Sequence, residues 1–354
     1  MATFRIADRI VDDDGHPFVI AEVSANHGGS LESALDLVRA AASSGVDAVK
    51  FQHYRPETIT IRSDLPEFKV GGGTLWDGRQ LFDLYAEAMT PWEWTEPLFR
   101  EAKSLGMVCF SSPFDETAVH FLEQHEPDAY KVASFELVDL PLIRVMAATG
   151  RPIIMSTGMA TVDEIDAAVD AARGAGCRDL AILRCNSGYP AEPSEMDLMA
   201  IPYMKARYEV QVGLSDHTLD SVASIAAVAL GATIFEKHII MRREIGGPDA
   251  AFSGEPHEFE KLVTDLRSAK AALGTARFGP SPREKSSIAF RRSLRVTRDL
   301  HPGEVLGEGD VRSMRPAGGL SPDLLSDVIG RRVRKAMVIG QAVSFDDLEE
   351  RVED

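Results

Sequence analysis

Short apolar runs alternate with amphipathic stretches along most of the chain, and this order predicts a parallel α/β fold. The apolar runs are rich in Val, Ile, Leu, Ala and Phe, as strands buried on both faces are. We expect strands at Phe18–Val23, Ala48–Gln52, Met107–Ser111, Ala129–Val132, Ile153–Ser156, Leu180–Arg184, Val210–Leu214 and Thr233–Lys237. The amphipathic stretches predict helices at Leu31–Ser43, Pro91–Ser104, Glu116–Gln124, Leu140–Ala148, Thr161–Ala172, Met196–Arg207, Leu219–Leu230 and Glu258–Leu273.

Eight strands, each followed by a helix, are the number that closes a (β/α)8 TIM barrel. An open doubly wound sheet is the alternative, but it usually has fewer strands, and no Gly-rich fingerprint follows the first run here. One connection, His53–Met89, is too long for an ordinary βα loop. Long insertions at this end of a barrel tend to form lids or walls of the substrate site.

The pattern changes near Leu273, which predicts a second domain. We expect the barrel over residues 1–274, a linker rich in Gly, Pro and Ser over residues 275–286, and a small β-rich domain over residues 287–354. Its short β-type runs are Ser293–Val296, Arg332–Ala336 and Ala342–Ser344. A domain of about 70 residues is marginally stable alone, so we expect it to dock against a barrel.

Composition narrows the possible partners and the compartment. The 354 residues carry a formal net charge of −17, which argues against nucleic acid or an anionic membrane as a partner. A local basic pocket for an anionic substrate is still compatible with that charge. The three cysteines have no metal-ligand or redox spacing, the N-terminus has no signal-peptide pattern, and no run of about 18 apolar residues occurs. We therefore expect a cytoplasmic protein.

Polar residues follow every predicted strand, at the rim where barrel enzymes place their active sites. A single polar residue there could simply cap the next helix. Polar residues at all eight strand ends are harder to attribute to capping.

Two histidines, His217 and His238, follow the seventh and eighth strands at equivalent positions. Neutral imidazoles on one rim can hold a divalent metal with positions open for substrate. The alternative is that one of them caps a helix or forms a hydrogen bond within the rim.

Two lysines, Lys50 and Lys131, lie at or inside predicted strands, where an unpaired lysine is costly. They could form ion pairs with Glu22 or Glu236. They could instead form a Schiff base, or bind an anion together with hydroxyl and amide groups. Neighbouring polar residues favour an anion site, and these are Gln52, Ser112, Ser134, Ser156, Ser187 and Ser215.

Other rim residues could orient substrate or move protons. The carboxylates Glu22, Glu136 and Asp249 could do either, or pair with a rim cation. His27 could be a third metal neighbour or a substrate contact.

The rim motifs closely resemble the N-acylneuraminate (sialic acid) synthase family. They are Ala21-Glu22-x-Ser24-x-Asn26-His27, Lys50-Phe51-Gln52, Ser112-Pro113-Phe114, Lys131-x-Ala133-Ser134-x-Glu136, Ser156-Thr157-Gly158-Met159, Gly213-Leu214-Ser215-Asp216-His217 and Glu236-Lys237-His238. The C-terminal part resembles that family's antifreeze-like (SAF) domain. Two further segments, Gly72–Arg79 and Thr90–Trp94, are similar to the pseudaminic acid synthase subgroup.

The resemblance implies condensation of phosphoenolpyruvate with the open-chain aldehyde of an acetamido sugar, without a Schiff base. The residues that would hold phosphoenolpyruvate are Lys50, Gln52, Ser112, Lys131, Ser134, Ser156, Ser187 and Ser215. His217 and His238 would bind Mn²⁺ or Mg²⁺. The acid–base or water-positioning group would be Glu22, with Glu136 near the reacting carbons. The remaining substrate contacts would be Asn26, His27, Tyr189 and Asp249.

Two points concern individual residues. This chain reads Cys185-Asn186-Ser187 before the Tyr-Pro pair, where many relatives read Cys-Thr-Asn or Cys-Thr-Ser, so either Asn186 or Ser187 could face the phosphate. In the family, the C-terminal domain of one subunit covers the barrel mouth of the other, and an arginine reaches the acyl group of the sugar. Here that residue is Arg315, and the arrangement implies a domain-swapped homodimer.

Three alternatives stay open. The acceptor could be N-acetylmannosamine or a legionaminic acid precursor, and the Trp76-Asp77-Gly78 segment, which should wall the sugar site, is the discriminating feature. The protein could be a Schiff-base aldolase acting through Lys131. It could also be a non-catalytic sugar- or ice-binding protein, although the intact set of rim residues argues against this.

Overall fold

A computed structural model of the protein describes residues 2–350, and the chain divides into two compact units, residues 1–274 and 275–354. The last four residues of the predicted C-terminal domain lie outside the described part. None of the helices in that part combines the length and apolar character that crossing a bilayer requires.

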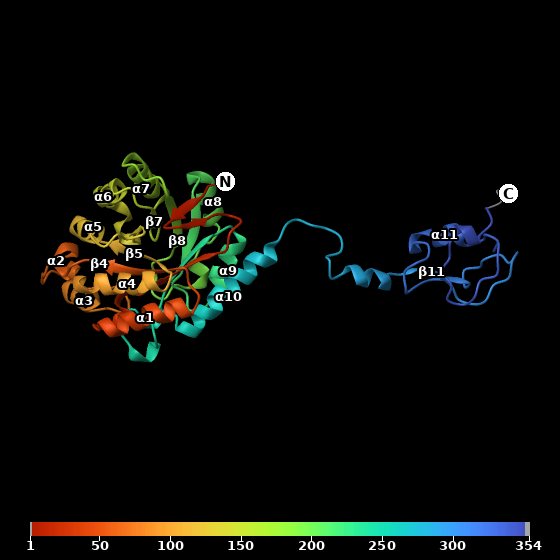
Figure 1. The fold of residues 1–354 in the computed structure, drawn as a ribbon, viewed down its shortest axis with the longest axis horizontal. Helices are drawn as coiled ribbons and strands as arrows, with labels where there is room; N and C mark the ends of the chain where they lie inside the picture. Colours follow the sequence, from red (N-terminus) through yellow and green to blue (C-terminus); the bar gives the residue numbers. More distant parts are fainter. Residues whose placement is uncertain (1, 351–354) are drawn as a thin grey trace. The chain divides into compact units, whose positions relative to one another are not determined.

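The first unit is a closed eight-stranded parallel barrel, which confirms the predicted TIM barrel (Figure 1). Its strands follow the order β10-β3-β4-β5-β6-β7-β8-β9, so the first barrel strand pairs with the last. They are β3 (Phe18–Glu22), β4 (Ala48–His53), β5 (Val108–Pro113), β6 (Tyr130–Val132), β7 (Ile153–Ser156), β8 (Leu180–Cys185), β9 (Gln211–Ser215) and β10 (Ile234–His238).

Eight helices surround the barrel, one after each strand (Figure 1). They are α1 (Leu31–Ser43), α4 (Thr95–Ser104), α5 (Glu116–Glu123), α6 (Leu140–Ala148), α7 (Val162–Gly174), α8 (Ala200–Tyr208), α9 (Val222–Ala229) and α10 (Pro256–Leu273). Side-chain caps fix several helix starts. Asp115 accepts hydrogen bonds from two backbone N–H groups of α5, and Thr161 forms a capping box with Glu164 at α7.

Alternation along each strand decides which side chains enter the barrel. In β3, Val19 and Ala21 pack in the outer core beneath the helices, while Phe18 and Ile20 belong to the inner core. The next residue on the inner face is Glu22, which is fully buried. The same alternation makes the upper inner layer of the other strands polar, so the barrel has an apolar lower half and a charged upper half.

An N-terminal hairpin, not predicted from the sequence, contributes to the apolar half. Strands β1 (Phe4–Ile6) and β2 (Arg9–Val11) pair in antiparallel fashion. Their side chains Phe4, Ile6 and Val11 join the inner core with residues from the starts of the barrel strands. The hairpin therefore closes the end of the barrel opposite the polar rim.

The predicted insertion after β4 carries its own small elements. These are α2 (Pro56–Ile59), η2 (Pro66–Phe68), α3 (Leu81–Ala88) and η3 (Trp92–Trp94). A single antiparallel bridge joins Lys69 to Gln80, so the segment between them forms a short hairpin-like turn.

The second unit is a small β-containing domain with its own apolar core. Strands β11 (Ser293–Val296) and β12 (Val311–Met314) pair in antiparallel fashion, and only the first of them was predicted. The expected strands at Arg332–Ala336 and Ala342–Ser344 are wrong, because these segments pair through isolated bridges such as Val333 to Leu348. The other elements of this unit are η8 (Lys285–Phe290), η9 (Pro322–Leu324), α11 (Leu325–Val328) and η10 (Phe345–Asp347).

Candidate active site

The register of two neighbouring strands brings the two histidines together. Ser215 of β9 is aligned with Glu236 of β10, so the residues two positions further on, His217 and His238, lie at the same level of the rim. Their ring centroids are 5.3 Å apart, and both side chains are buried.

Hydrogen bonding leaves a nitrogen lone pair available on each ring. Nδ1 of His217 lies 2.8 Å from the backbone carbonyl of Asn186. A carbonyl only accepts, so Nδ1 carries the proton and Nε2 of the neutral ring is unprotonated. Nδ1 of His238 has no hydrogen-bond partner and lies 3.7 Å from a carboxylate oxygen of Asp249.

This pair fits a divalent transition metal through two imidazole nitrogens. A backbone carbonyl that orients a metal-binding histidine is a common second partner at metal sites. Within residues 2–350, no three His, Cys, Asp or Glu side chains are grouped so as to hold a metal. Two imidazole ligands alone would leave coordination positions open to water or substrate oxygen atoms.

Below the histidines, two lysines and two glutamates form a buried charge network. Nζ of Lys50 lies 2.5 Å from Glu22 and 3.5 Å from Glu236, and Nζ of Lys131 lies 3.5 Å from the other oxygen of Glu236. The ion pairs considered as an alternative for these lysines are thus present. Two positive and two negative charges neutralise one another, which makes burial of all four groups tolerable.

The network shifts the pKa of its members in different directions. Burial alone would raise the pKa of Glu236, but the ammonium groups of Lys131 and Lys50 hold it well below its usual range. Burial would lower the pKa of Lys50, but Glu22 and Glu236 raise it above normal. Burial lowers the pKa of Lys131, and Glu236 offsets this only in part. Lys131 is therefore the lysine that most needs further negative charge nearby.

Hydroxyl and amide groups surround the two ammonium groups. Lys50 donates a hydrogen bond to Ser112 (3.3 Å), and Lys131 donates one to Ser156 (2.7 Å). Ser215 donates to Glu236 (3.1 Å). Gln52, which lies two positions after Lys50 on the inner face of β4, donates a hydrogen bond to Ser24 (2.9 Å). These side chains form a polar cluster of the kind that binds a small anion.

The absence of a side chain at Gly158 leaves room for two predicted serines beside this polar cluster. A Cβ atom at Gly158 would lie 2.4 Å from Cβ of Ser134 and 2.7 Å from Oγ of Ser187. By contrast, the side chain of Asn186 is occupied locally, because it donates to Glu195 O (2.9 Å) and accepts from the backbone N–H of Gly188 (2.7 Å). Of the two candidates for the phosphate contact, this geometry favours Ser187.

The carboxyl group of Glu136 is available for proton transfer. Its Oε2 is buried without a hydrogen-bond partner. Burial raises the pKa of Glu136 to about 7, and the charge of Lys131 opposes this shift. Glu22 differs, because its Oε1 accepts the backbone N–H of Ser24 (2.9 Å) and its Oε2 pairs with Lys50. One carboxyl group is thus near its titration point and the other is paired.

Two residues after β3 have partners within the protein. The amide nitrogen of Asn26 donates to Ile239 O and to Ser253 Oγ, each at 2.8 Å, so it anchors the loop after β10. The imidazole of His27 accepts from the backbone N–H of Gly29 (3.1 Å) through Nδ1, while its buried Nε2 has no hydrogen-bond partner. Oδ1 of Asn26 is also buried without a partner. A substrate could therefore use one atom of each side chain.

Aromatic rings cover the histidine pair. The ring of Tyr189 lies 4.5 Å from that of His217, and the ring of Phe252 lies 4.9 Å from those of Tyr189 and His238. The histidine pair is therefore flanked by apolar surface.

Arg315 belongs to the second unit, where it directly follows β12. Its side chain is exposed. The other predicted site residues all belong to the barrel unit.

Two buried residues of this rim have contacts that were not predicted in full. Glu236 was named only as one possible ion-pair partner of the lysines, and it is the shared counter-charge of both. Its position two residues before His238 places it on the same inner face of β10, and that spacing could have identified it. Cys185 lies 4.0 Å from Nδ1 of His217, a contact that the cysteine spacing does not reveal.

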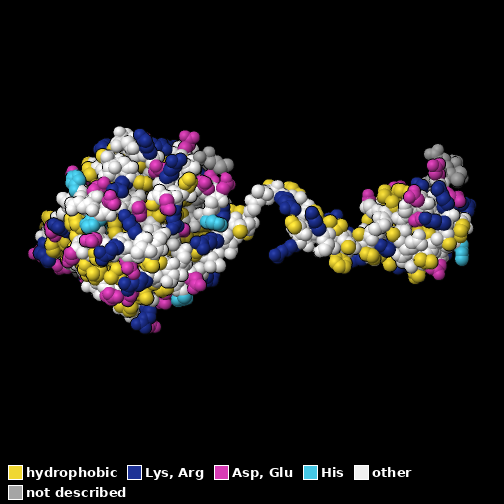
Figure 2. Space-filling view, viewed as in Figure 1, with side chains coloured by type: hydrophobic (Ala, Val, Ile, Leu, Met, Phe, Trp, Pro, Cys, Tyr) yellow, Lys and Arg dark blue, Asp and Glu magenta, His cyan; other side chains and the backbone are white. Residues whose placement is uncertain are grey.

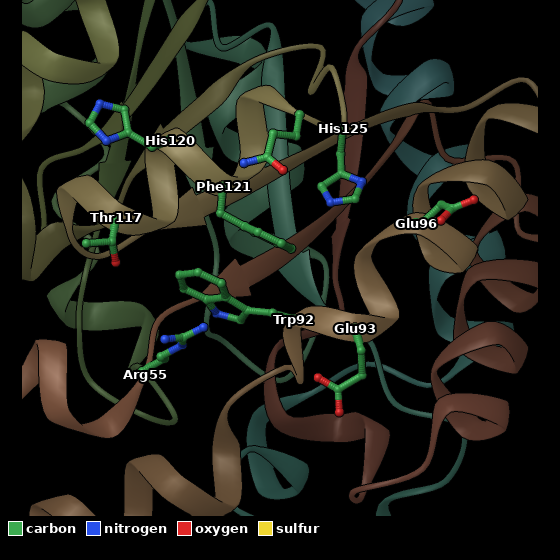
Figure 3. Close-up of a pocket in the computed structure, with 9 residues that line it drawn as sticks. Arg55, Trp92, Glu93, Glu96, Thr117, His120, Phe121 and His125 are labelled. Atoms are coloured by element: carbon green, nitrogen blue, oxygen red, sulfur yellow. The ribbon is translucent and has the colours of Figure 1, made fainter.

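A separate cavity of about 510 Å³ lies outside this site, between α4 and α5 (Figure 3). The guanidinium of Arg55 lies 4.2 Å from the centre of the Trp92 ring, which in turn stacks on Phe121 at 4.5 Å. None of the predicted site residues lines this cavity.

Comparisons with known proteins assign both units to described families. Residues 37–278 match the NeuB family, and residues 291–349 match the SAF domain. Pseudaminic acid synthases from Campylobacter jejuni and Helicobacter pylori are 40% and 38% identical over 94% of this chain, covering 97% and 98% of those proteins. Relatives named as N,N′-diacetyllegionaminic acid synthases are more distant, at 32% and 33% identity.

Solved structures agree with this assignment. The crystal structure of a spore coat polysaccharide biosynthesis protein from Bacillus subtilis is 29% identical. It aligns with 99% of this chain and 100% of its own chain, with a TM-score of 0.67.

Proposed function

The chain belongs to the NeuB family, and from this premise we propose that it acts as a pseudaminic acid synthase. The reaction condenses phosphoenolpyruvate, 2,4-diacetamido-2,4,6-trideoxy-L-altrose and water to give pseudaminic acid and phosphate. The observation that carries this proposal is the 40% identity to a pseudaminic acid synthase over 94% of the chain. The polar cluster around Lys50 and Lys131 and the paired histidines supply groups suited to this condensation.

Phosphoenolpyruvate would bind above the charge network. Its carboxylate and phosphate would take the hydrogen bonds of Lys50, Lys131 and the surrounding serines, with Ser187 facing the phosphate. Lys131 supports this placement because burial lowers its pKa and Glu236 is only a partial counter-charge. A bound anion would complete the compensation of its charge.

The proposed reaction forms one C–C bond and breaks one C–O bond. Carbon C3 of phosphoenolpyruvate attacks the aldehyde carbon of the sugar, the new C–C bond forms, and the aldehyde oxygen gains a proton. Water adds to C2 and supplies that proton, which gives a tetrahedral intermediate. The C2–O bond to phosphorus then breaks, the second water proton leaves with phosphate, and a 2-keto acid remains.

Two carboxyl groups would serve these proton movements. Glu22, fixed by Ser24 and Lys50, would position the water on C2. Glu136, whose pKa is raised to about 7, would donate its proton to the aldehyde oxygen and would be reprotonated by the water that adds to C2. Mn²⁺ or Mg²⁺ held by His217 and His238 would supply Lewis-acid polarisation of that oxygen when bound.

We further propose a domain-swapped homodimer, in which Arg315 of one subunit approaches the sugar bound by the other. The barrel unit carries the acidic excess of the chain, whereas the C-terminal unit has nearly equal numbers of basic and acidic side chains. Acidic and basic side chains are interspersed on the face of the barrel unit that Figure 2 shows. Sedimentation at the mass of one 38.6 kDa chain would contradict the dimer.

All three cysteines are free and buried, which suits the cytoplasm, the compartment we propose.

The test of the proposed function is phosphate release from phosphoenolpyruvate in the presence of Mn²⁺. We expect turnover with the diacetamido-trideoxy-altrose and at least about 100-fold lower kcat/KM with N-acetylmannosamine, since a site built for two acetamido groups leaves polar groups unpaired with one. Preference for N-acetylmannosamine would move the protein to the sialic acid branch. Absence of phosphate release with either sugar would contradict a synthase.

The raised pKa of Glu136 predicts a pH-dependent step. Glu136 is protonated below about pH 7 and ionises as the pH rises through that value. Ionisation removes the proton donor and adds a negative charge beside an anionic substrate, so kcat/KM for phosphoenolpyruvate is expected to fall above pH 7. The measurement is a pH–rate profile of the wild-type protein and of Glu136→Gln. The variant should lose the limb near pH 7, and a limb that persists there would assign it to another group.

A further inference from the structure

The insertion after β4 contains an ordered turn, before α3, that carries one tryptophan. The carboxylate of Asp77 accepts hydrogen bonds from the backbone N–H groups of Gly73 (2.8 Å) and Thr74 (2.9 Å). Gly78 follows with φ +81°, a conformation that favours glycine, and its N–H bonds to Val70 O (2.7 Å). Asp77 and Gly78 therefore fix the backbone on which Trp76 sits.

Trp76 contacts two other rim segments. Its indole N–H donates to the carbonyl of Pro248 (2.9 Å), in the loop after β10. Its ring lies 5.7 Å from that of Tyr189, which follows β8. The insertion that follows β4 thus reaches the loop after β10, although β3 lies between these two strands in the barrel.

This bridge reaches the histidine pair through short steps. Pro248 directly precedes Asp249, whose carboxylate lies 3.7 Å from His238. Tyr189 lies 4.5 Å from His217. Trp76 is half-buried, so part of its ring is accessible while its polar atom is already bonded to protein. What it offers a ligand is apolar aromatic surface.

We propose that Trp76 determines acceptor specificity by packing against a methyl-bearing face of the sugar. This inference rests on the proposed function, in which the aldehyde end of the sugar lies at the two histidines. The rest of the acceptor then extends toward Tyr189 and Trp76. A diacetamido-trideoxy sugar carries three methyl groups, two in acetamido groups and one at C6, whereas N-acetylmannosamine carries one.

The experiment compares Trp76→Ala, Trp76→Phe and the control Leu75→Ala, which removes an exposed apolar side chain from the same turn. KM is measured separately for phosphoenolpyruvate and for each of the two sugars. Loss of packing against one or two methyl groups is worth about 10- to 200-fold. We expect Trp76→Ala to raise KM for the diacetamido sugar by about 30-fold, with smaller effects on KM for N-acetylmannosamine and for phosphoenolpyruvate. Trp76→Phe should keep most of the affinity.

Other results would overturn the proposal in identifiable ways. Equal increases in KM for all substrates would indicate a general disturbance of the rim. A Trp76→Phe variant as weak as Trp76→Ala would assign the effect to the hydrogen bond with Pro248, and a similar effect of Leu75→Ala would assign it to the turn. If wild-type protein used only N-acetylmannosamine, the proposed function would fail, and an unchanged KM for that sugar in Trp76→Ala would then overturn the role of Trp76 as well.

Discussion

Replacing His217 with alanine is expected to abolish turnover and leave phosphoenolpyruvate binding nearly intact. His217 and His238 are the paired imidazoles of the rim, with ring centroids 5.3 Å apart, and the charge network of Lys50 and Lys131 lies below them. A metal that polarises a carbonyl is worth several kcal/mol, so kcat should fall by at least about 1,000-fold, or about 4 kcal/mol. The dissociation constant of phosphoenolpyruvate should change by less than about threefold.

The measurement pairs kcat at saturating Mn²⁺ with titrations of Mn²⁺ and of phosphoenolpyruvate by calorimetry. The matched control is His16→Ala, which removes an exposed histidine from the segment between β2 and β3, at the opposite end of the barrel. Full activity of His217→Ala, or Mn²⁺ affinity equal to that of the control, would remove His217 from the metal site. Loss of phosphoenolpyruvate binding in step with kcat would point to general damage of the rim.

Glu236→Gln is expected to cause the largest loss of stability among single isosteric changes at this rim. The substitution leaves Lys131 buried without its nearest counter-charge, and breaking a buried pair in this way costs about 3–5 kcal/mol. Because burial already lowers the pKa of Lys131, this lysine can escape the penalty by losing its proton. Deprotonation is favoured as the pH rises, so the loss of stability should shrink toward high pH.

Urea unfolding at pH 7 and pH 9 measures this effect directly. The control is Asp166→Asn, which breaks the ion pair of Asp166 with Arg207 on the barrel surface. Exposed pairs contribute about 0–1 kcal/mol, so this variant should stay close to wild type. Phosphoenolpyruvate should restore part of the stability of Glu236→Gln, since its negative charges can replace the missing carboxylate. Equal losses in the two variants would mean that Glu236 is not the counter-charge of Lys131.

The barrel could be predicted from the sequence because its strands are buried on both faces and therefore appear as short apolar runs. Where such runs alternate with amphipathic helices, they indicate strands of a parallel sheet. The predicted run Ile153–Ser156 coincides with β7, and the others differ from the observed strands by one or two residues at one or both ends. The position of Lys50 and Lys131 at or inside those runs also indicated that they needed partners, and Glu22 and Glu236 were named as candidates. That Glu236 is shared by both lysines depends on how three different strands meet inside the barrel, which no local pattern encodes.

Other features were out of reach for the same reason. The hairpin of β1 and β2 has three residues in each strand, too few for a periodic signal, and it is stabilised by contacts with the inner core. The amides of Asn26 and Asn186 are held by backbone carbonyls whose positions only the folded loops define. Outside the ladder of β11 and β12, the C-terminal unit is joined by single bridges, so β-type runs there were poor guides to strands.

The pairing of β3 with β10 has a consequence for synthesis in the cell. The barrel cannot close until residues 234–238 have left the ribosome, and until then β3 and the growing sheet present unpaired edges that invite aggregation. More than a hundred residues, including the whole C-terminal unit, follow His238 and are synthesised after it. At about 5–20 residues per second, this takes on the order of ten seconds. During this time the chain that follows β10 keeps the barrel attached to the ribosome while β10 pairs with β3.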